Sequence, residues 1–215
     1  MRVWLWVLLL AVHGCATSNL PDVNTPDLSK ISKIQSEDVA PDAEGKRPTF
    51  HETIDQAAAS VGKQNLRKTA LGVDDIEVRV WGGFGMTSVR GFLITRKGGV
   101  WAASSIEAEF NMPRSLKYKE TALSEPARGW EAPWQSLLEH RLLTLPDAES
   151  IDCSAMYEDG YSYVVEIKKG KSYRTYMYDN PHHKFDNRCP EADEILAIAN
   201  IIMNDYRLAR FRGDY

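Results

Sequence analysis

The stretch IEVRV, residues 76–80, alternates strictly between apolar and charged side chains. Successive side chains of a β-strand point to opposite faces of the sheet, so Ile76, Val78 and Val80 would lie together on one face. The alternation therefore predicts a strand that is half-buried in a sheet, with its apolar face toward a core.

The segments that follow carry further strand signals. Residues 89–96 and 100–110 are strand candidates, and the sequence Lys97-Gly98-Gly99 between them is typical of a turn. Residues 116–121 are a fourth candidate. Residues 161–168 and 172–178 then predict a hairpin, for which a two-residue and a three-residue loop both fit.

Three other segments have helical periodicity. Residues 51–68 place apolar side chains loosely on one side, and residues 131–145 form an apolar stripe that Pro146 ends. Residues 190–206 begin with a proline and an acidic first turn and continue as an apolar face. We predict one α+β domain over residues 49–215, with a single antiparallel sheet, helices packed on one face and a long C-terminal helix.

The N-terminal sequence has the pattern of an export signal. Met1 and Arg2 supply positive charge, and residues 3–12 form an unbroken apolar run. Ten residues are too few for a membrane span, which needs about 20. Residues 1–14 are therefore predicted to be a signal peptide.

The end of this signal, Val12-His13-Gly14-Cys15, resembles the lipobox of bacterial lipoproteins, although His13 departs from the small or aliphatic residue that is usual there. The resemblance implies cleavage before Cys15, a lipid on its thiol and a membrane anchor in the cell envelope. Ala16, where Asp is absent, implies the outer membrane, facing the periplasm. Two alternatives remain: a cut after Ala16 that releases a soluble periplasmic or secreted protein, and an uncleaved anchor.

The segment after Cys15 is predicted to be a disordered spacer. Residues 16–48 mix polar residues with four of the ten prolines of the chain and show no sustained apolar period. Such a composition cannot bury enough surface to offset its ordering entropy. The spacer of a lipoprotein would hold the folded domain clear of the membrane.

The cysteine count supports this division of the chain. If Cys15 carries the lipid, Cys153 and Cys189 remain as a pair. An oxidising compartment favours a disulfide between them, worth about 4 kcal/mol for a loop of this length. Two unpaired thiols in a reducing compartment are the alternative.

The predicted hairpin is unusually rich in aromatic side chains. Tyr163, Tyr176 and Tyr178, together with Arg174, are candidates for a binding surface, because tyrosine combines apolar area with a polar tip. The alternative is a strand pair with one face in the core. Phe84, in the glycine-rich loop of residues 82–85, is a further candidate as an exposed anchor, and an ordinary turn is its alternative.

Motifs for catalysis and metal binding are weak. Residues 60–63 match the SxxK pattern without convincing partner motifs, and GxSxG and HExxH do not occur. His182-His183, flanked by Asp179 and Asp186, lacks a third spaced histidine, so no metal site or cofactor is predicted. Several carboxylates could supply a hydrolytic pair if they met in space; these are Asp152, Glu158, Asp159 and Glu166.

The whole sequence thus predicts a lipid-anchored protein of the bacterial cell envelope. The net charge of −4 and the lack of a clustered basic face argue against nucleic acid as a partner. Without a catalytic motif, a binding or structural module with the membrane and an envelope protein as partners is the first hypothesis. An envelope hydrolase of unrecognised type is the second hypothesis.

Overall fold

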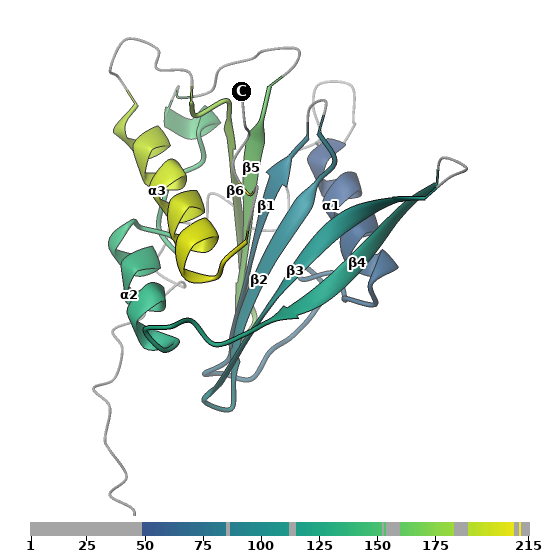
Figure 1. Cartoon of the computed structure of the whole chain (residues 1–215). Coiled ribbons are helices and arrows are strands. Elements are labelled where there is room, and N and C mark those ends of the chain that lie inside the picture. The colour runs from purple at the N-terminus through teal and green to yellow at the C-terminus, as the bar shows by residue number, and fades with distance from the viewer. Residues whose placement is uncertain are drawn as a thin grey trace, which may run out of the picture.

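The computed structural model describes residues 49–84, 87–111, 115–151, 153, 160–182, 189–208 and 211. These residues form one sheet with helices on both sides (Figure 1). The predicted signal peptide, lipid site and spacer lie outside the described residues.

Six strands form the sheet in the order β4-β3-β2-β1-β5-β6, and every neighbouring pair is antiparallel. Their bounds are β1 Ile76–Gly83, β2 Arg90–Lys97, β3 Val100–Asn111, β4 Ser115–Leu123, β5 Ser162–Lys169 and β6 Ser172–Asp179. Pairing of Lys97 with Val100 and of Lys169 with Ser172 shows that the β2–β3 and β5–β6 hairpins have two-residue loops. Strand β1, which contains IEVRV, lies inside the sheet between β2 and β5.

Within the described ranges, three α-helices accompany the sheet: α1 Thr49–Ser60, α2 Glu131–Glu139 and α3 Pro190–Asp205. A short 3-10 helix, η2, spans Glu149–Ile151. The predicted α+β class, the single antiparallel sheet and the long C-terminal helix are confirmed. None of the helices within the described ranges is long and apolar enough to cross a membrane.

Helix α1 ends earlier than its periodicity predicts. Gly62 has φ +76°, and its N–H donates to the Ala59 carbonyl at 2.9 Å. The N–H of Lys63 reaches back to the Ala58 carbonyl, also at 2.9 Å. These two bonds form a Schellman motif, which satisfies the last carbonyls and turns the chain out of the helix.

Helix α2 ends in the same way. Arg141 has φ +59° and donates to Leu138, while the N–H of Leu142 donates to Leu137. Residues 142–145 therefore leave the predicted helix, yet Leu142 and Leu145 remain buried in the core. Their apolar spacing reflects burial rather than helical geometry.

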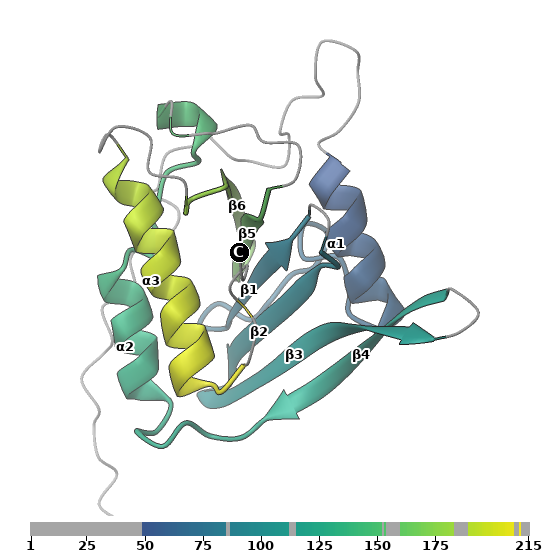
Figure 2. The same cartoon turned by 45° about the horizontal axis from the view of Figure 1, so that its top comes forward.

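The prediction that the helices share one face is wrong, because α1 lies on the side of the sheet opposite α2 and α3 (Figures 1 and 2). On one face, Val78 and Val80 pack with the buried side chains of α2 and α3. On the other face, Ile54 of α1 packs with Trp81 and Leu93. The apolar pattern of residues 51–68 could not specify which face it would cover.

Strand β1 is consequently buried on both faces rather than half-buried. All eight of its residues are buried, including Glu77 and Arg79. By strand alternation these charged side chains lie on the face that carries α1. The fold thus encloses polar groups that the sequence pattern alone would leave to solvent.

Candidate functional site

The tyrosines of the hairpin belong to the core. Tyr163 on β5 and Tyr176 and Tyr178 on β6 are each at most 1% exposed, on the face that α2 and α3 cover. The Tyr176 hydroxyl donates to the Leu142 carbonyl at 2.7 Å, and that of Tyr178 donates to Pro146 at 2.8 Å. The predicted binding surface is wrong for these three tyrosines, because the pairing register turns them toward the helices.

The other two candidates for that surface, Arg174 and Phe84, are half-buried and lie against different cores. The Nη1 of Arg174 donates to the Leu143 carbonyl at 2.5 Å, and its guanidinium lies 5.0 Å from the Tyr176 ring centroid. Burial lowers the pKa of Arg174. Phe84 has φ +73° and packs against the core beneath α1. These residues do not form one exposed patch.

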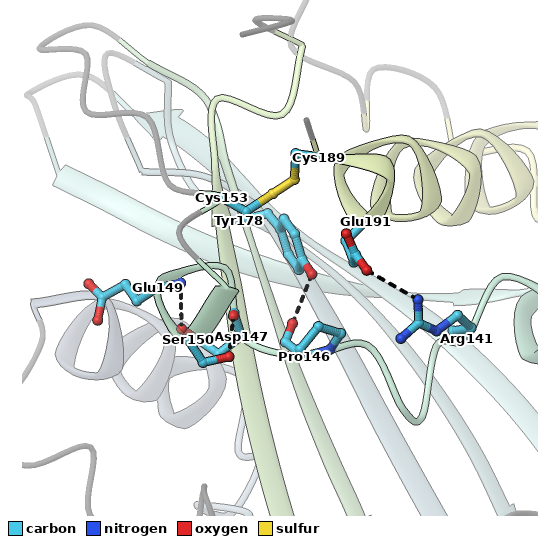
Figure 3. Close-up of a disulfide and its surroundings, with 9 residues drawn as sticks. All are labelled: Arg141, Pro146, Asp147, Glu149, Ser150, Cys153, Tyr178, Cys189 and Glu191. Atoms are coloured by element: carbon cyan, nitrogen blue, oxygen red, sulfur yellow. Dashed lines mark hydrogen bonds and ion pairs between the residues drawn. A yellow bond between two sulfur atoms is a disulfide. The ribbon is translucent and has the colours of Figure 1, made fainter. Parts of the chain in front are cut away.

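Cys153 and Cys189 lie at disulfide-bonding distance, with their Cα atoms 5.7 Å apart (Figure 3). This separation is within the roughly 4.4–6.8 Å range of disulfides. The pair would link the segment before β5 to the residue before α3. Tyr178 lies beside this link, and Arg141 pairs with Glu191 of α3 at 3.5 Å.

The structure gives little support to the residues considered as metal ligands or as a catalytic carboxylate pair. Within the described part of the chain, no three His, Cys, Asp or Glu side chains are grouped to hold a metal ion. His183 and Asp186 lie outside it, as do Asp152, Glu158 and Asp159. Glu166, the described member of the carboxylate set, is buried on β5.

A cavity of about 480 Å³ lies on the sheet face that carries α1. The segment that follows α1 forms one wall, and strands β1 to β4 supply the rest of the lining. Its charged lining residues are Lys63, Glu77, Arg79, Lys97 and Glu120. We refer to this cavity as the charged pocket.

An ion-pair chain crosses the floor of the charged pocket. Arg79, only 2% exposed, donates from Nε and Nη2 to Oε1 of Glu77 at 3.0 and 2.8 Å. Its Nη2 also donates to the Gln64 carbonyl at 2.9 Å. Lys97 donates to Oε2 of Glu77 at 3.0 Å. Burial opposes ionisation of Glu77, but Arg79 and Lys97 outweigh it and lower the pKa of this carboxyl.

A second ion pair lies where the segment after α1 meets β4 in the lining of the charged pocket. Lys63 lies 2.6 Å from Glu120 of β4, because the Schellman motif after α1 turns the chain toward this strand. Burial of Glu120 is offset by hydrogen bonds from Lys63 and Ser104, so the pKa of the carboxyl is lowered. Both carboxylates of the pocket are therefore ionised at neutral pH.

Glu166, next to the charged pocket on the same face, anchors the segment after α1. It accepts hydrogen bonds from Trp81 at 2.9 Å and from Tyr173 at 3.0 Å, and Arg67 lies 4.0 Å away. Arg67 also pairs with Asp55 of α1. Burial raises the pKa of Glu166 despite these partners. This cluster fixes the wall of the pocket against the sheet.

The alternation in IEVRV does not indicate the charged pocket, because it predicts a half-buried strand whose polar positions face solvent. The sequence does hold a usable signal: β1 and β5 both place charged residues at alternate positions. In the register, Glu77 pairs with Lys168, and Arg79 pairs with Glu166. Such complementary charges on two interior strands indicate a covered polar face.

Comparisons with family models and with curated proteins supply no role for this chain. No family model matches the sequence, and no curated protein matches it. The chemistry of the charged pocket is therefore what can carry a functional conclusion.

Proposed function

We propose that this protein is a lipid-anchored binding module of the bacterial cell envelope and that the charged pocket is its ligand site. The lipid on Cys15 would hold it at the outer membrane, facing the periplasm, with residues 16–48 as the spacer. Its partners would be the membrane, through this lipid, and an envelope component that enters the pocket. Nucleic acid is not an expected partner.

The observation that carries the proposal is the charged pocket itself. Its volume falls within the roughly 300–1,000 Å³ of small-molecule sites. Four of its five charged residues stand on sheet strands, and only Lys63 comes from the segment after α1. The sheet holds the backbone of these residues in fixed positions, which lowers the ordering cost of binding.

The pocket carboxylates are ionised and held in ion pairs, which favours a binding function over hydrolysis. Ser104 would need a neighbouring base to act as a nucleophile. Glu120, which contacts Ser104, is paired with Lys63 and has a lowered pKa. A carboxylate stabilised in its charged form is a poor proton acceptor, so this pair does not suit a nucleophile and its base.

The anchor is tested by Cys15→Ser in the bacterial envelope. We expect the wild type to take up a radiolabelled fatty acid and to sediment with membranes, and the variant to lose both properties. An unlabelled, soluble wild-type protein would refute the lipid anchor.

The binding role is tested by filling the charged pocket. Ala122 lines the pocket from β4 and is exposed, so Ala122→Trp should occupy the cavity without disturbing a core. Detergent-solubilised protein is incubated with an envelope extract, washed, and analysed by mass spectrometry for retained molecules. We expect a component that the wild type retains and Ala122→Trp does not.

The matched control is Lys119→Trp, on the same strand. Lys119 is exposed, pairs with Glu109 at 3.6 Å and does not line the pocket. This variant should retain the component as the wild type does. Equal retention by all three proteins, or retention by none, would refute a ligand site in the pocket.

A further inference from the structure

The charges that line the pocket do not cancel. Lys63, Arg79 and Lys97 contribute three positive charges, and Glu77 and Glu120 contribute two negative charges, which leaves +1. A ligand with one negative charge would neutralise the site. A doubly charged phosphate would instead leave an excess of negative charge in a partly buried cavity, which is unfavourable.

The hydrogen-bonding groups of the pocket also favour a negatively charged ligand. Both oxygens of Glu77 are engaged, Oε1 by Arg79 and Oε2 by Lys97. The Nη1 of Arg79 has no partner within the described ranges, because its bonds use Nε and Nη2. Lys63 and Lys97 each carry three donor hydrogens and one carboxylate partner apiece. The unused groups are mainly donors, so the site favours an acceptor.

We propose that the charged pocket binds a small polar molecule through a single carboxylate, which Arg79, Lys97 and Lys63 hold. Arg79 supplies a fixed donor at the floor, because Glu77 and the Gln64 carbonyl hold its guanidinium in place. The two lysines, which are less buried, close on the carboxylate from the sides. This inference rests on the proposed binding function and names the ligand class for the same pocket.

The test compares a carboxylic acid with its uncharged amide. The processed full chain in detergent micelles is titrated with N-acetylalanine and, separately, with N-acetylalanine amide, and backbone amide shifts are followed by NMR. A probe this small is expected to bind in the millimolar range. The acid should shift the resonances of β1 and β2 around Arg79 and Lys97, and the amide should leave them unchanged. Inorganic phosphate is the third probe and should bind more weakly than the acid.

Single variants assign the effect to the pocket. Lys97→Gln and Lys63→Gln should each weaken binding of the acid about fivefold to tenfold, because each removes one charge-assisted hydrogen bond. Lys119→Gln removes a lysine from an exposed ion pair outside the pocket and should change the affinity by less than about twofold. Unchanged spectra of the free variants show that each one is folded.

Several outcomes would overturn the carboxylate inference: equal binding of acid and amide, no binding of the acid, tighter binding of phosphate, or an equal effect of Lys119→Gln. If the wild type still retains an envelope component that Ala122→Trp loses, the binding function stands and only the ligand class is wrong. If retention is also absent, both proposals fail.

Discussion

Two buried carboxyl groups on neighbouring strands, Glu77 and Glu166, have pKa values that are shifted in opposite directions. Burial penalises the charged form of both. At Glu77, the cations Arg79 and Lys97 outweigh this penalty and the pKa is lowered. At Glu166, burial outweighs Arg79, Trp81 and its other partners, and the pKa is raised. Stability should therefore depend on pH differently at the two positions.

Glu166→Gln tests the raised pKa. The folded-state pKa of Glu166 lies above its ordinary value of 4.5, so its contribution to the free energy of unfolding is complete below that pH and declines as the pH rises. Glutamine does not titrate. The stability advantage of the wild type over Glu166→Gln should therefore be smaller at about pH 7 than at about pH 5 in urea unfolding.

Glu77→Gln is the comparison for this experiment. The lowered pKa of Glu77 places its titration below the ordinary value of 4.5, so its contribution is complete above that pH. The advantage of the wild type over Glu77→Gln should stay level between about pH 5 and pH 7. An advantage over Glu166→Gln that grows with pH would contradict the assigned direction.

At the scale of elements, the segment between α1 and β1 has the largest consequence for the site. It has no regular secondary structure, yet its contacts close the charged pocket. The Schellman motif at Gly62 turns it toward the sheet, and Arg67 fixes it to Asp55 and Glu166. The position of Lys63 in the pocket therefore depends on how α1 ends.

Gly62→Ala tests that dependence. The φ of +76° disfavours any residue with a Cβ, while no atom lies within 4 Å of the added carbon. The loss should therefore come from the backbone alone and lower the free energy of unfolding by about 1 kcal/mol. Gly62→Asn should cost less, because asparagine tolerates this conformation better. Equal costs for both variants, measured in urea, would contradict this explanation of the helix end.

The sequence predicts the positions of helices and strands along the chain better than their packing in space. Periodicity predicts the six strands and the three helices of the described residues, because local alternation follows from the geometry of each element. It extends the first helix to residue 68, since a lone Gly62 does not by itself reveal a Schellman motif. It does not indicate the charged pocket, because the burial of Arg79 depends on α1 and on the segment after it. The local pattern of β1 does not encode where these two segments pack.

At the scale of the molecule, the sheet separates two environments. One face carries the larger core with α2, α3 and the buried tyrosines. The other carries α1, a smaller core and the charged pocket. The larger core can stabilise the domain while the charged pocket on the opposite face carries a net positive charge. The proposed link between Cys153 and Cys189 lies on the side of α3, so it would stabilise the fold without entering the pocket.

The disulfide can be measured directly. We expect no alkylatable thiol in the processed, non-reduced protein and two after reduction, because the proposed lipid would block the thiol of Cys15. The double variant with Cys153→Ser and Cys189→Ser should lose about 4 kcal/mol of stability and keep the pocket intact. Two free thiols before reduction would show that the pair is not bonded.

The central claim is that the charged face of β1 lines a ligand site. It is tested most directly by NMR of the processed full chain, titrated with the small-molecule fraction of envelopes. We predict that the shifted resonances cluster around Lys63, Arg79 and Lys97 and that Ala122→Trp abolishes them. Shifts confined to the region of Cys153 and Cys189, or no shifts at all, would contradict the claim.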